Sequence, residues 1–215
     1  MTHNIKKSRE NMIAKHIYRP LSEPIAIFLS RTKISPNQVT LFSVFLSVLS
    51  GIFFSFAKWE CSILGAVFLQ LAILSDHVDG NLARYTNKSS DFGVWWDHMA
   101  NKQIKFFALM GMSYGAYKQL GNPLVLLLGS SAIFNITYSG FISQLKRDVP
   151  GAENKTLMPE SEKVFFPASL ITYTIMTIGG LINQLWLPIG FLGTFGFIWI
   201  KQILNVYQGS KSQAL

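Results

Sequence analysis

Three aspartates and one asparagine at fixed spacing are the residues of this sequence best suited to chemistry. Asp76 and Asp79 lie three residues apart, so on a helix they share one face, with Cβ atoms about 5–6 Å apart. Gly93, Asp97 and Asn101 follow at intervals of four, which again makes one helical stripe. The connection between the two segments, roughly residues 85–90, is short. We therefore expect two antiparallel neighbouring helices whose acidic faces meet at one end.

Such a cluster of acids needs compensating positive charge, because carboxylates at membrane depth are costly and repel one another. Arg84 and Lys102 cannot neutralise three acids and also fix their positions. Oxygen ligands on rigid helices suit Mg²⁺, with Mn²⁺ as an alternative, as two ions roughly 3.5–4 Å apart that would hold a diphosphate. The expected ligands are the carboxylates of Asp76, Asp79 and Asp97. The competing interpretation is a set of acids that face a water-filled cavity.

The composition indicates a membrane protein. Of the 215 residues, 49% are hydrophobic and only 14% are charged, whereas soluble domains average roughly 25% charged residues. The net charge of +8 is compatible with nucleic-acid binding, but in a membrane chain a basic excess lies in cytoplasmic loops and faces anionic lipid. We therefore expect membrane lipid, and no nucleic acid, as a partner. The single cysteine, Cys61, excludes an internal disulfide framework.

Six membrane spans are predicted from the distribution of charge. Uncharged stretches follow one another along the chain: residues 34–57, 61–75, 106–117, 119–145 and 164–200. The third stretch reaches the roughly 20 residues needed to cross a bilayer only if its helix begins near Asp91 and includes Asp97. The last is long enough for two helices, with Gly179-Gly180 and Asn183-Gln184 marking the turn.

If both termini are cytoplasmic, all Lys and Arg residues except Lys58 and Lys118 lie inside, as the positive-inside rule requires. The predicted fold is thus an all-α integral membrane protein with six transmembrane helices, preceded by an amphipathic surface helix. Residues 1–35 are expected to form a cytoplasmic juxtamembrane arm, residues 36–206 the transmembrane catalytic domain, and residues 207–215 a cytoplasmic tail. We expect a multi-pass protein of the cell (inner) membrane, with an active site that faces the cytoplasm.

The acidic residues belong to a longer pattern that resembles a family signature. Asp76-x-x-Asp79-Gly80-x-x-Ala83-Arg84, eight residues, and Gly93-x-x-x-Asp97-x-x-x-Asn101 are similar to the signature of the CDP-alcohol phosphotransferases. Pro36-Asn37-x-x-Thr40 is also similar to a feature of this family. Many fixed positions at fixed spacing make the signal more specific than one short motif.

The resemblance implies a reaction, its partners and its site residues. A CDP-alcohol donor would bind with its diphosphate on the metals, and a hydroxyl acceptor, lipid or polar alcohol, would attack and release CMP in phospholipid biosynthesis. The resemblance also implies that the protein forms a homodimer. Gly80 and Ala83 would accommodate the cytidine, and Arg84 would support the nucleotide or the acids. The full substrate-binding set is Asn37, Thr40, Asp79, Gly80, Ala83, Arg84 and Gly93.

Asn101 departs from the family pattern, in which this position is a fourth Asp. The resemblance makes Asp97 and Asn101 catalytic, and it makes the residue at position 101 both a fourth metal ligand, beside Asp76, Asp79 and Asp97, and the base for the acceptor hydroxyl. An amide can coordinate a metal weakly through its carbonyl, but it cannot take a proton at neutral pH. Either Asn101 replaces a natural Asp and traps a substrate complex, which we favour because the other positions are intact, or this member is slow or inactive.

Two other functions stay open. The chain could be a non-catalytic membrane protein that binds a CDP-alcohol, or, less favourably, an ion-coupled transporter. The arm sequence looks more similar to family members that transfer small phospho-alcohols than to those that transfer phosphatidyl groups. Candidate acceptor-side residues, each with an equally good structural interpretation, are Asn135, Tyr138, Ser139 and Lys163.

Overall fold

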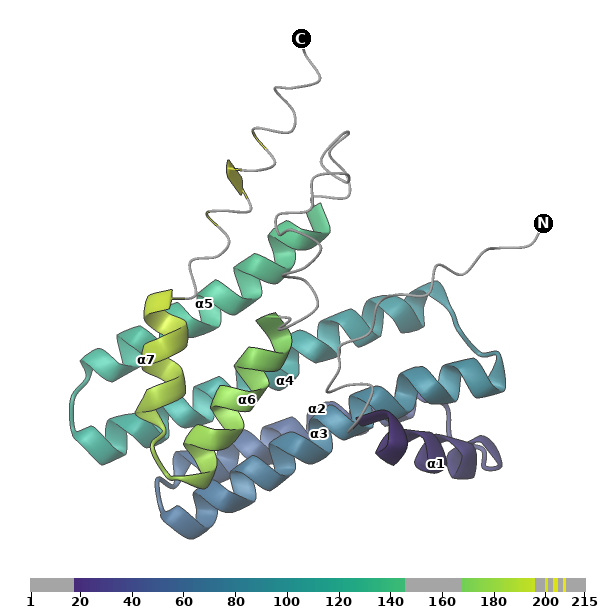
Figure 1. The fold of residues 1–215 in the computed structure, drawn as a ribbon, viewed down its shortest axis with the longest axis horizontal. Coiled ribbons are helices and arrows are strands. Elements are labelled where there is room, and N and C mark those ends of the chain that lie inside the picture. Colours follow the sequence, from purple (N-terminus) through teal and green to yellow (C-terminus); the bar gives the residue numbers. More distant parts are fainter. Residues whose placement is uncertain (1–17, 146–167, 196–199, 201–202, 205–206, 208–215) are drawn as a thin grey trace.

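The computed structural model describes residues 18–145 and 168–195, together with residues 200, 203, 204 and 207. Every secondary-structure element in this part of the chain is a helix, which confirms the all-α prediction (Figure 1). The helices are α1 (Arg19–Ser30), α2 (Pro36–Ser55), α3 (Trp59–Thr86), α4 (Asp91–Leu120), α5 (Leu124–Leu145), α6 (Ala168–Leu181) and α7 (Trp186–Phe195). Residues 146–167 and all of the predicted tail at 207–215 except residue 207 fall outside the described residues.

Local sequence signals set the ends of the helices that carry the signature. Before α2, the Ser35 hydroxyl accepts from the Gln38 N–H, and the Gln38 side chain accepts from the Ser35 N–H at 2.9 Å, which is a capping box. Ser90 caps α4 by accepting from the Gly93 N–H at 3.0 Å. Asn87, in the left-handed region with φ 51°, ends α3. The helix of the third apolar stretch, α4, therefore begins at Asp91, as expected.

Helix α2 packs along both α3 and α4, whereas α3 and α4 contact each other little. Helices α3 and α4 run antiparallel, as expected (Figure 1), but they contact each other over a short region only. The approach of α2 to α4 depends on Gly51 and Gly111, because a Cβ on Gly111 would collide with the backbone of Gly51. Backbones that touch in this way leave no room for a side chain between them.

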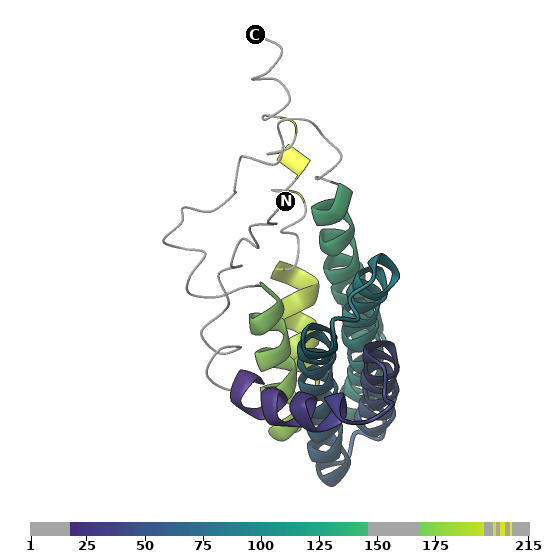
Figure 2. The same cartoon turned by 90° about the vertical axis from the view of Figure 1, so that its right-hand side faces the viewer.

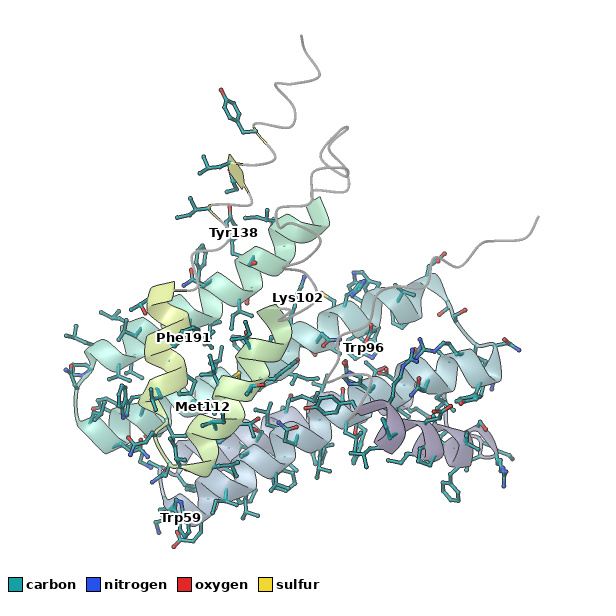
Figure 3. All side chains as sticks on the ribbon, viewed as in Figure 1. Trp59, Trp96, Lys102, Met112, Tyr138 and Phe191 are labelled. Atoms are coloured by element: carbon teal, nitrogen blue, oxygen red, sulfur yellow. The ribbon has the colours of Figure 1, made fainter. Side chains whose placement is uncertain are left out.

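The turn between α6 and α7 includes Asn183 and Gln184, as predicted, while the two glycines lie in the last turn of α6. Gly179 and Gly180 are inside α6, and Asn183, with φ 54°, makes the turn. The two glycines provide close packing instead: a Cβ on Gly179 would lie 2.7 Å from the Pro188 ring, and one on Gly180 would lie 2.6 Å from the Phe54 ring. Phe54 belongs to the main apolar core, which also contains Leu69, Leu109, Met112 and Met176. Of these, Met112 is labelled in Figure 3.

Helix α1 crosses the end of the bundle at which α3 connects to α4 (Figure 2). It buries Ser22 and Ala26 against α3 and leaves Phe28 69% exposed, so it is amphipathic. Pro20 lies in the first turn of the helix, where a missing N–H costs little, whereas Pro24 lies inside the helix and leaves the Pro20 carbonyl without its usual N–H donor. The earlier apolar residues of the predicted arm, Ile13 and Ile17, lie outside the described residues.

Two helices of the described part, α2 and α3, are long and apolar enough to cross a membrane. Residues 124–139 and 171–181 form shorter apolar helices. Helix α4 is long enough to cross a bilayer, but its N-terminal half contains two aspartates and two lysines: Asp91, Asp97, Lys102 and Lys105.

The contact between α2 and α4 gives a first prediction. Gly111→Ala should destabilise the detergent-solubilised protein by about 1–3 kcal/mol, because the new methyl group meets backbone that cannot move aside. At this chain length each kcal/mol lowers Tm by about 2–4 °C. Gly190→Ala on α7 is the matched control, because a Cβ there meets no atom within 4 Å. Equal melting temperatures of the two variants would contradict this account of the helix contact.

Candidate active site

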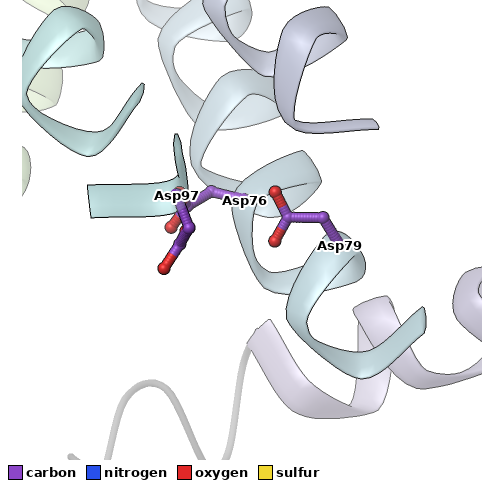
Figure 4. A group of neighbouring side chains, drawn as sticks. All are labelled: Asp76, Asp79 and Asp97. Carbon is purple, nitrogen blue, oxygen red and sulfur yellow. The ribbon is translucent and has the colours of Figure 1, made fainter. Parts of the chain in front are cut away.

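Asp76, Asp79 and Asp97 point into one space near the ends of α3 and α4 (Figure 4). One carboxylate oxygen of each lies within 4.8 Å of the others. Asp79 is only 3% exposed, while Asp76 and Asp97 are half-buried. The sequence predicts this meeting from the spacing of three residues on α3 and from the start of α4 near Asp91.

Thr40 ties the acid cluster to α2. Its buried hydroxyl lies 2.5 Å from Asp79 Oδ2 and 3.1 Å from the Pro36 carbonyl oxygen. The capping box that starts α2 at Pro36 places Thr40 one turn into the helix, so the local signal at Ser35 determines which residue reaches Asp79. A hydroxyl that donates to this carboxylate fixes its orientation and partly offsets its burial.

The chemistry of the cluster fits divalent cations. Asp76 Oδ1 is buried and has no hydrogen-bond partner among the described residues, although a buried carboxylate oxygen is costly when it is left unpaired. Three carboxylates on two rigid helices offer the hard oxygen ligands that Mg²⁺ and Mn²⁺ prefer. The cluster could therefore bind a metal.

Asn101 lies one helical turn beyond Asp97 and turns its amide toward it. Asn101 Nδ2 is 3.3 Å from both the backbone oxygen and Oδ1 of Asp97. An amide N–H₂ donates to the neighbouring carboxylate, whereas a carboxylate at this position would add a fourth acid. The structure thus brings Asn101 to the edge of the acid cluster, beside Asp97.

A cavity of about 210 Å³ adjoins the acids. Seven of the residues that line it form the complete set expected to bind substrate: Asn37, Thr40, Asp79, Gly80, Ala83, Arg84 and Gly93. The sequence analysis missed Lys88, Ser89 and Ser90, which also line the cavity and lie in the α3–α4 connection. Their position between the two halves of the signature was the available signal, because a connection between two converging helix ends must border the space between them.

The two signature glycines have different surroundings. A Cβ on Gly80 would meet no atom within 4 Å, so packing inside the protein gives no reason for a glycine there. A Cβ on Gly93 would lie 3.2 Å from Ser90 Oγ and 3.3 Å from Asn37 Oδ1. Gly80 therefore keeps a part of the cavity wall open, while Gly93 also allows α2 to approach the start of α4.

A second group of polar residues borders the acids and was not found from the sequence. Lys105 Nζ lies over the Tyr173 ring, 5.1 Å from its centroid, and Lys105 is close enough to Asp76 to interact with it electrostatically. Tyr173 is 9% exposed, and its hydroxyl has no hydrogen-bond partner among the described residues. His77 stacks on Tyr18 with ring centroids 4.7 Å apart. These residues come from α3, α4, α6 and the position directly before α1, and no sequence motif connects them.

Asn135, expected as an acceptor-side residue, instead connects two helices. Its Nδ2 donates to the backbone oxygen of Leu192 at 3.1 Å, which joins α5 to α7. Lys163 lies outside the described residues.

Comparisons with known proteins agree with the geometry of the site. The sequence pattern of the CDP-alcohol phosphatidyltransferase family matches residues 33–207. An archaetidylinositol phosphate synthase from Pyrococcus horikoshii is 25% identical over 199 residues, which cover 93% of this chain and 95% of that protein. An uncharacterized protein from Aquifex aeolicus is 33% identical over 127 residues, which cover 58% of this chain and 63% of that protein. The chain spans less than half the length of two related bifunctional IPC transferase and DIPP synthases.

Solved structures share the fold. The phosphatidylinositol phosphate synthase of Mycobacterium tuberculosis, crystallised with CDP-DAG bound, aligns with a TM-score of 0.65 and 16% identity over 88% of this chain and 92% of that chain. Its complex with manganese and citrate aligns with a TM-score of 0.62 and 17% identity over 87% and 86% of the two chains. The match over residues 33–207 includes both halves of the signature, and the chain belongs to the CDP-alcohol phosphatidyltransferase family.

Proposed function

We propose that this protein transfers a phospho-alcohol or phosphatidyl group from a CDP-alcohol to a hydroxyl acceptor and releases CMP. One observation carries the proposal: all seven residues that were expected to bind substrate line the cavity beside the acids. The cytidine would lie against Gly80 and Ala83, and the Arg84 guanidinium would face the nucleotide. The diphosphate would then extend from this cavity to Asp76, Asp79 and Asp97.

The reaction is a displacement at the β-phosphorus. The acceptor oxygen forms a new P–O bond, the bond to the oxygen that bridges the two phosphates breaks, and CMP leaves with that electron pair. The acceptor proton passes to a base. In family members this base is the acid at position 101, which is Asn in this chain. Two Mg²⁺ or Mn²⁺ ions held by Asp76, Asp79 and Asp97, with Asn101 as a weak further ligand, would neutralise charge that develops on the phosphoryl oxygens.

The acceptor approaches from the side of Lys105 and Tyr173 in this proposal. In an in-line displacement the attacking and leaving oxygens lie on opposite sides of the phosphorus. Lys105 and Tyr173 interact with each other and lie near Asp76, but they do not line the nucleotide cavity. They therefore replace Asn135 as the acceptor-side candidates. One relative is named an archaetidylinositol phosphate synthase, and another is named a bifunctional IPC transferase and DIPP synthase. These names support tests with both classes of donor.

The membrane topology is also part of the proposal. We infer six spans within residues 36–206, with α1 and the rest of the arm on the membrane surface and both termini in the cytoplasm. The apolar lengths of α2 and α3 and the family support a membrane location. The charge distribution favours the cell (inner) membrane with the active site at its cytoplasmic face, and a homodimer would follow the family.

A non-catalytic role in CDP-alcohol binding is the second candidate, and one observation favours it. Asn101 donates to Asp97 where the reaction needs a group that accepts a proton. Such a protein would bind the nucleotide without turning it over.

The metal site gives a direct binding test. Asp79→Asn should abolish the stabilisation of the purified protein by MnCl₂ with CDP, because the buried carboxylate is lost while side-chain volume is kept. At ligand concentrations of 100 Kd this stabilisation amounts to about 2.7 kcal/mol, measured by thermal unfolding. Asp91→Asn is the control, because Asp91 is an exposed acid in the first turn of α4 and does not line the cavity. Unchanged stabilisation of Asp79→Asn, or of the parent protein in EDTA, would contradict the metal assignment.

The residue at position 101 gives a kinetic test. Asn101→Asp should raise CMP release by at least about a hundredfold, because general-base assistance contributes about 10²–10⁴ in rate. CMP release would be followed with a panel of CDP-alcohols and acceptors, while CDP affinity should change much less. Gln103→Glu adds the same charge to another face of α4 and should leave the rate unchanged. Equal rates of the parent and the Asp variant would mean that a fourth acid is not needed.

Cysteine labelling tests the topology. In a Cys61→Ser background, a cysteine at Ser210 should react only from the cytoplasmic side, and one at Ile182 only from the outer side. Ile182 is 50% exposed in the α6–α7 turn, and it avoids Asn183, whose side chain accepts hydrogen bonds from Ser62 and Gln119. Labelling of position 210 from outside the cell would exclude the six-span arrangement.

A further inference from the structure

A polar contact is buried between α1 and α3, close to the nucleotide cavity. Asn81 Nδ2 donates to Ser22 Oγ at 2.8 Å, with Ser22 fully buried and Asn81 9% exposed. The contact lies beside a small apolar cluster of Ala26, Val39, Val78 and Leu82. An apolar pair would pack the two helices without the desolvation penalty that buried amides and hydroxyls carry. The polar pair therefore needs a reason beyond helix packing.

The other end of the Asn81 side chain holds Arg84. Asn81 Oδ1 accepts from Arg84 Nη2 at 2.5 Å, and Arg84 lines the cavity. The two residues are three apart on α3, so they lie on one face of the helix. Arg84 is otherwise exposed, and a long exposed side chain samples many rotamers unless a partner fixes it.

The Ser22 contact determines which end of the amide faces Arg84. An amide has a donor end and an acceptor end, and a guanidinium only donates. With the N–H₂ group engaged by Ser22, the carbonyl oxygen must face Arg84. If the amide rotated by 180°, two donors would face each other. Helix α1 thus orients a side chain of α3 that in turn orients a side chain of the cavity.

We propose that Asn81, oriented by Ser22 of α1, is a positioning residue that holds the Arg84 guanidinium against the nucleotide cavity, so that the docking of α1 sets the affinity for the nucleotide diphosphate. The inference rests on the proposed function, since it takes the cavity to bind a cytidine nucleotide. It adds that the surface helix, which supplies no residue to the cavity lining, takes part in nucleotide binding.

The test is nucleotide binding by the full-length protein in detergent, with CDP and MnCl₂ as the probe. Asn81→Leu should weaken CDP binding by about three- to tenfold, the effect expected when one long side chain must be immobilised on binding. Ser22→Ala should weaken it in the same direction by a smaller factor, because the amide then loses its preferred orientation. Isothermal calorimetry gives the Kd, and thermal unfolding without ligand reports stability separately.

A double-mutant cycle shows whether the effect passes through Arg84. In an Arg84→Ala background, Asn81→Leu should cause no further loss of CDP affinity. Tyr85→Phe is the matched control, because the Tyr85 hydroxyl also joins α3 to α1, through Glu23 Oε1 at 2.6 Å, but takes no part in the hydrogen bonds that connect Ser22, Asn81 and Arg84. This control should leave the Kd for CDP unchanged.

The outcomes separate the two proposals. If the parent protein binds no CDP, the proposed function fails before the variants are compared. If the parent binds CDP and Asn81→Leu binds it equally well, the positioning role is wrong. Equal weakening by Tyr85→Phe, or a full effect of Asn81→Leu in the Arg84→Ala background, would overturn it too. If Asn81→Leu does not fold, the Kd of Ser22→Ala for CDP decides the question, because this variant loses only the hydroxyl. A Kd equal to that of the parent protein would overturn the positioning role.

Discussion

The mutual repulsion of three carboxylates within 4.8 Å is the constraint on which the rest of this structure depends. The acids come from α3 and α4, which barely touch, so the helix between them must hold the cluster together. Helix α2 does so in two ways. Its glycine contact brings α4 close, and its first turn supplies Thr40 to Asp79. The capping box at Ser35 belongs to the same arrangement, because it fixes where that first turn begins.

The charged residues and the apolar core lie at different levels along the helices, because the three carboxylates need water or cations nearby. The acids and the cavity residues gather near the α3–α4 connection, while the main apolar core fills the bundle farther along, around Phe54 and Met112. An acid in the middle of such a core would meet neither water nor a cation. At the end of the bundle, the polar connection and α1 can surround the acids with donors, as Ser22 and Asn81 illustrate.

The sequence predicted those parts of the site that depend on spacing within one helix. Asp76 with Asp79, and Asp97 with Asn101, were placed correctly because 3.6 residues per turn leave little freedom. The start of α4 followed from the length that a span requires. The position of α2 could not be predicted, because a helix that is apolar on all sides does not reveal which face meets which neighbour. Lys105 and Tyr173 were missed because 68 residues and a change of helix separate them in the chain. The turn at Asn183 was predicted, but the packing of Gly179 and Gly180 against Pro188 and Phe54 was not, because glycine is favoured by turns and by close packing alike.

The glycine contact between α2 and α4 has a mechanical consequence. Where two backbones touch directly, no side chain can change rotamer to absorb a displacement. Such close approaches occur at Gly51, Gly111 and Gly115, so α2 and α4 touch over more than one helical turn. A shift of one helix against the other meets backbone along this whole length. The two helices are therefore expected to move as one rigid unit, which carries Thr40 and Asp97 together.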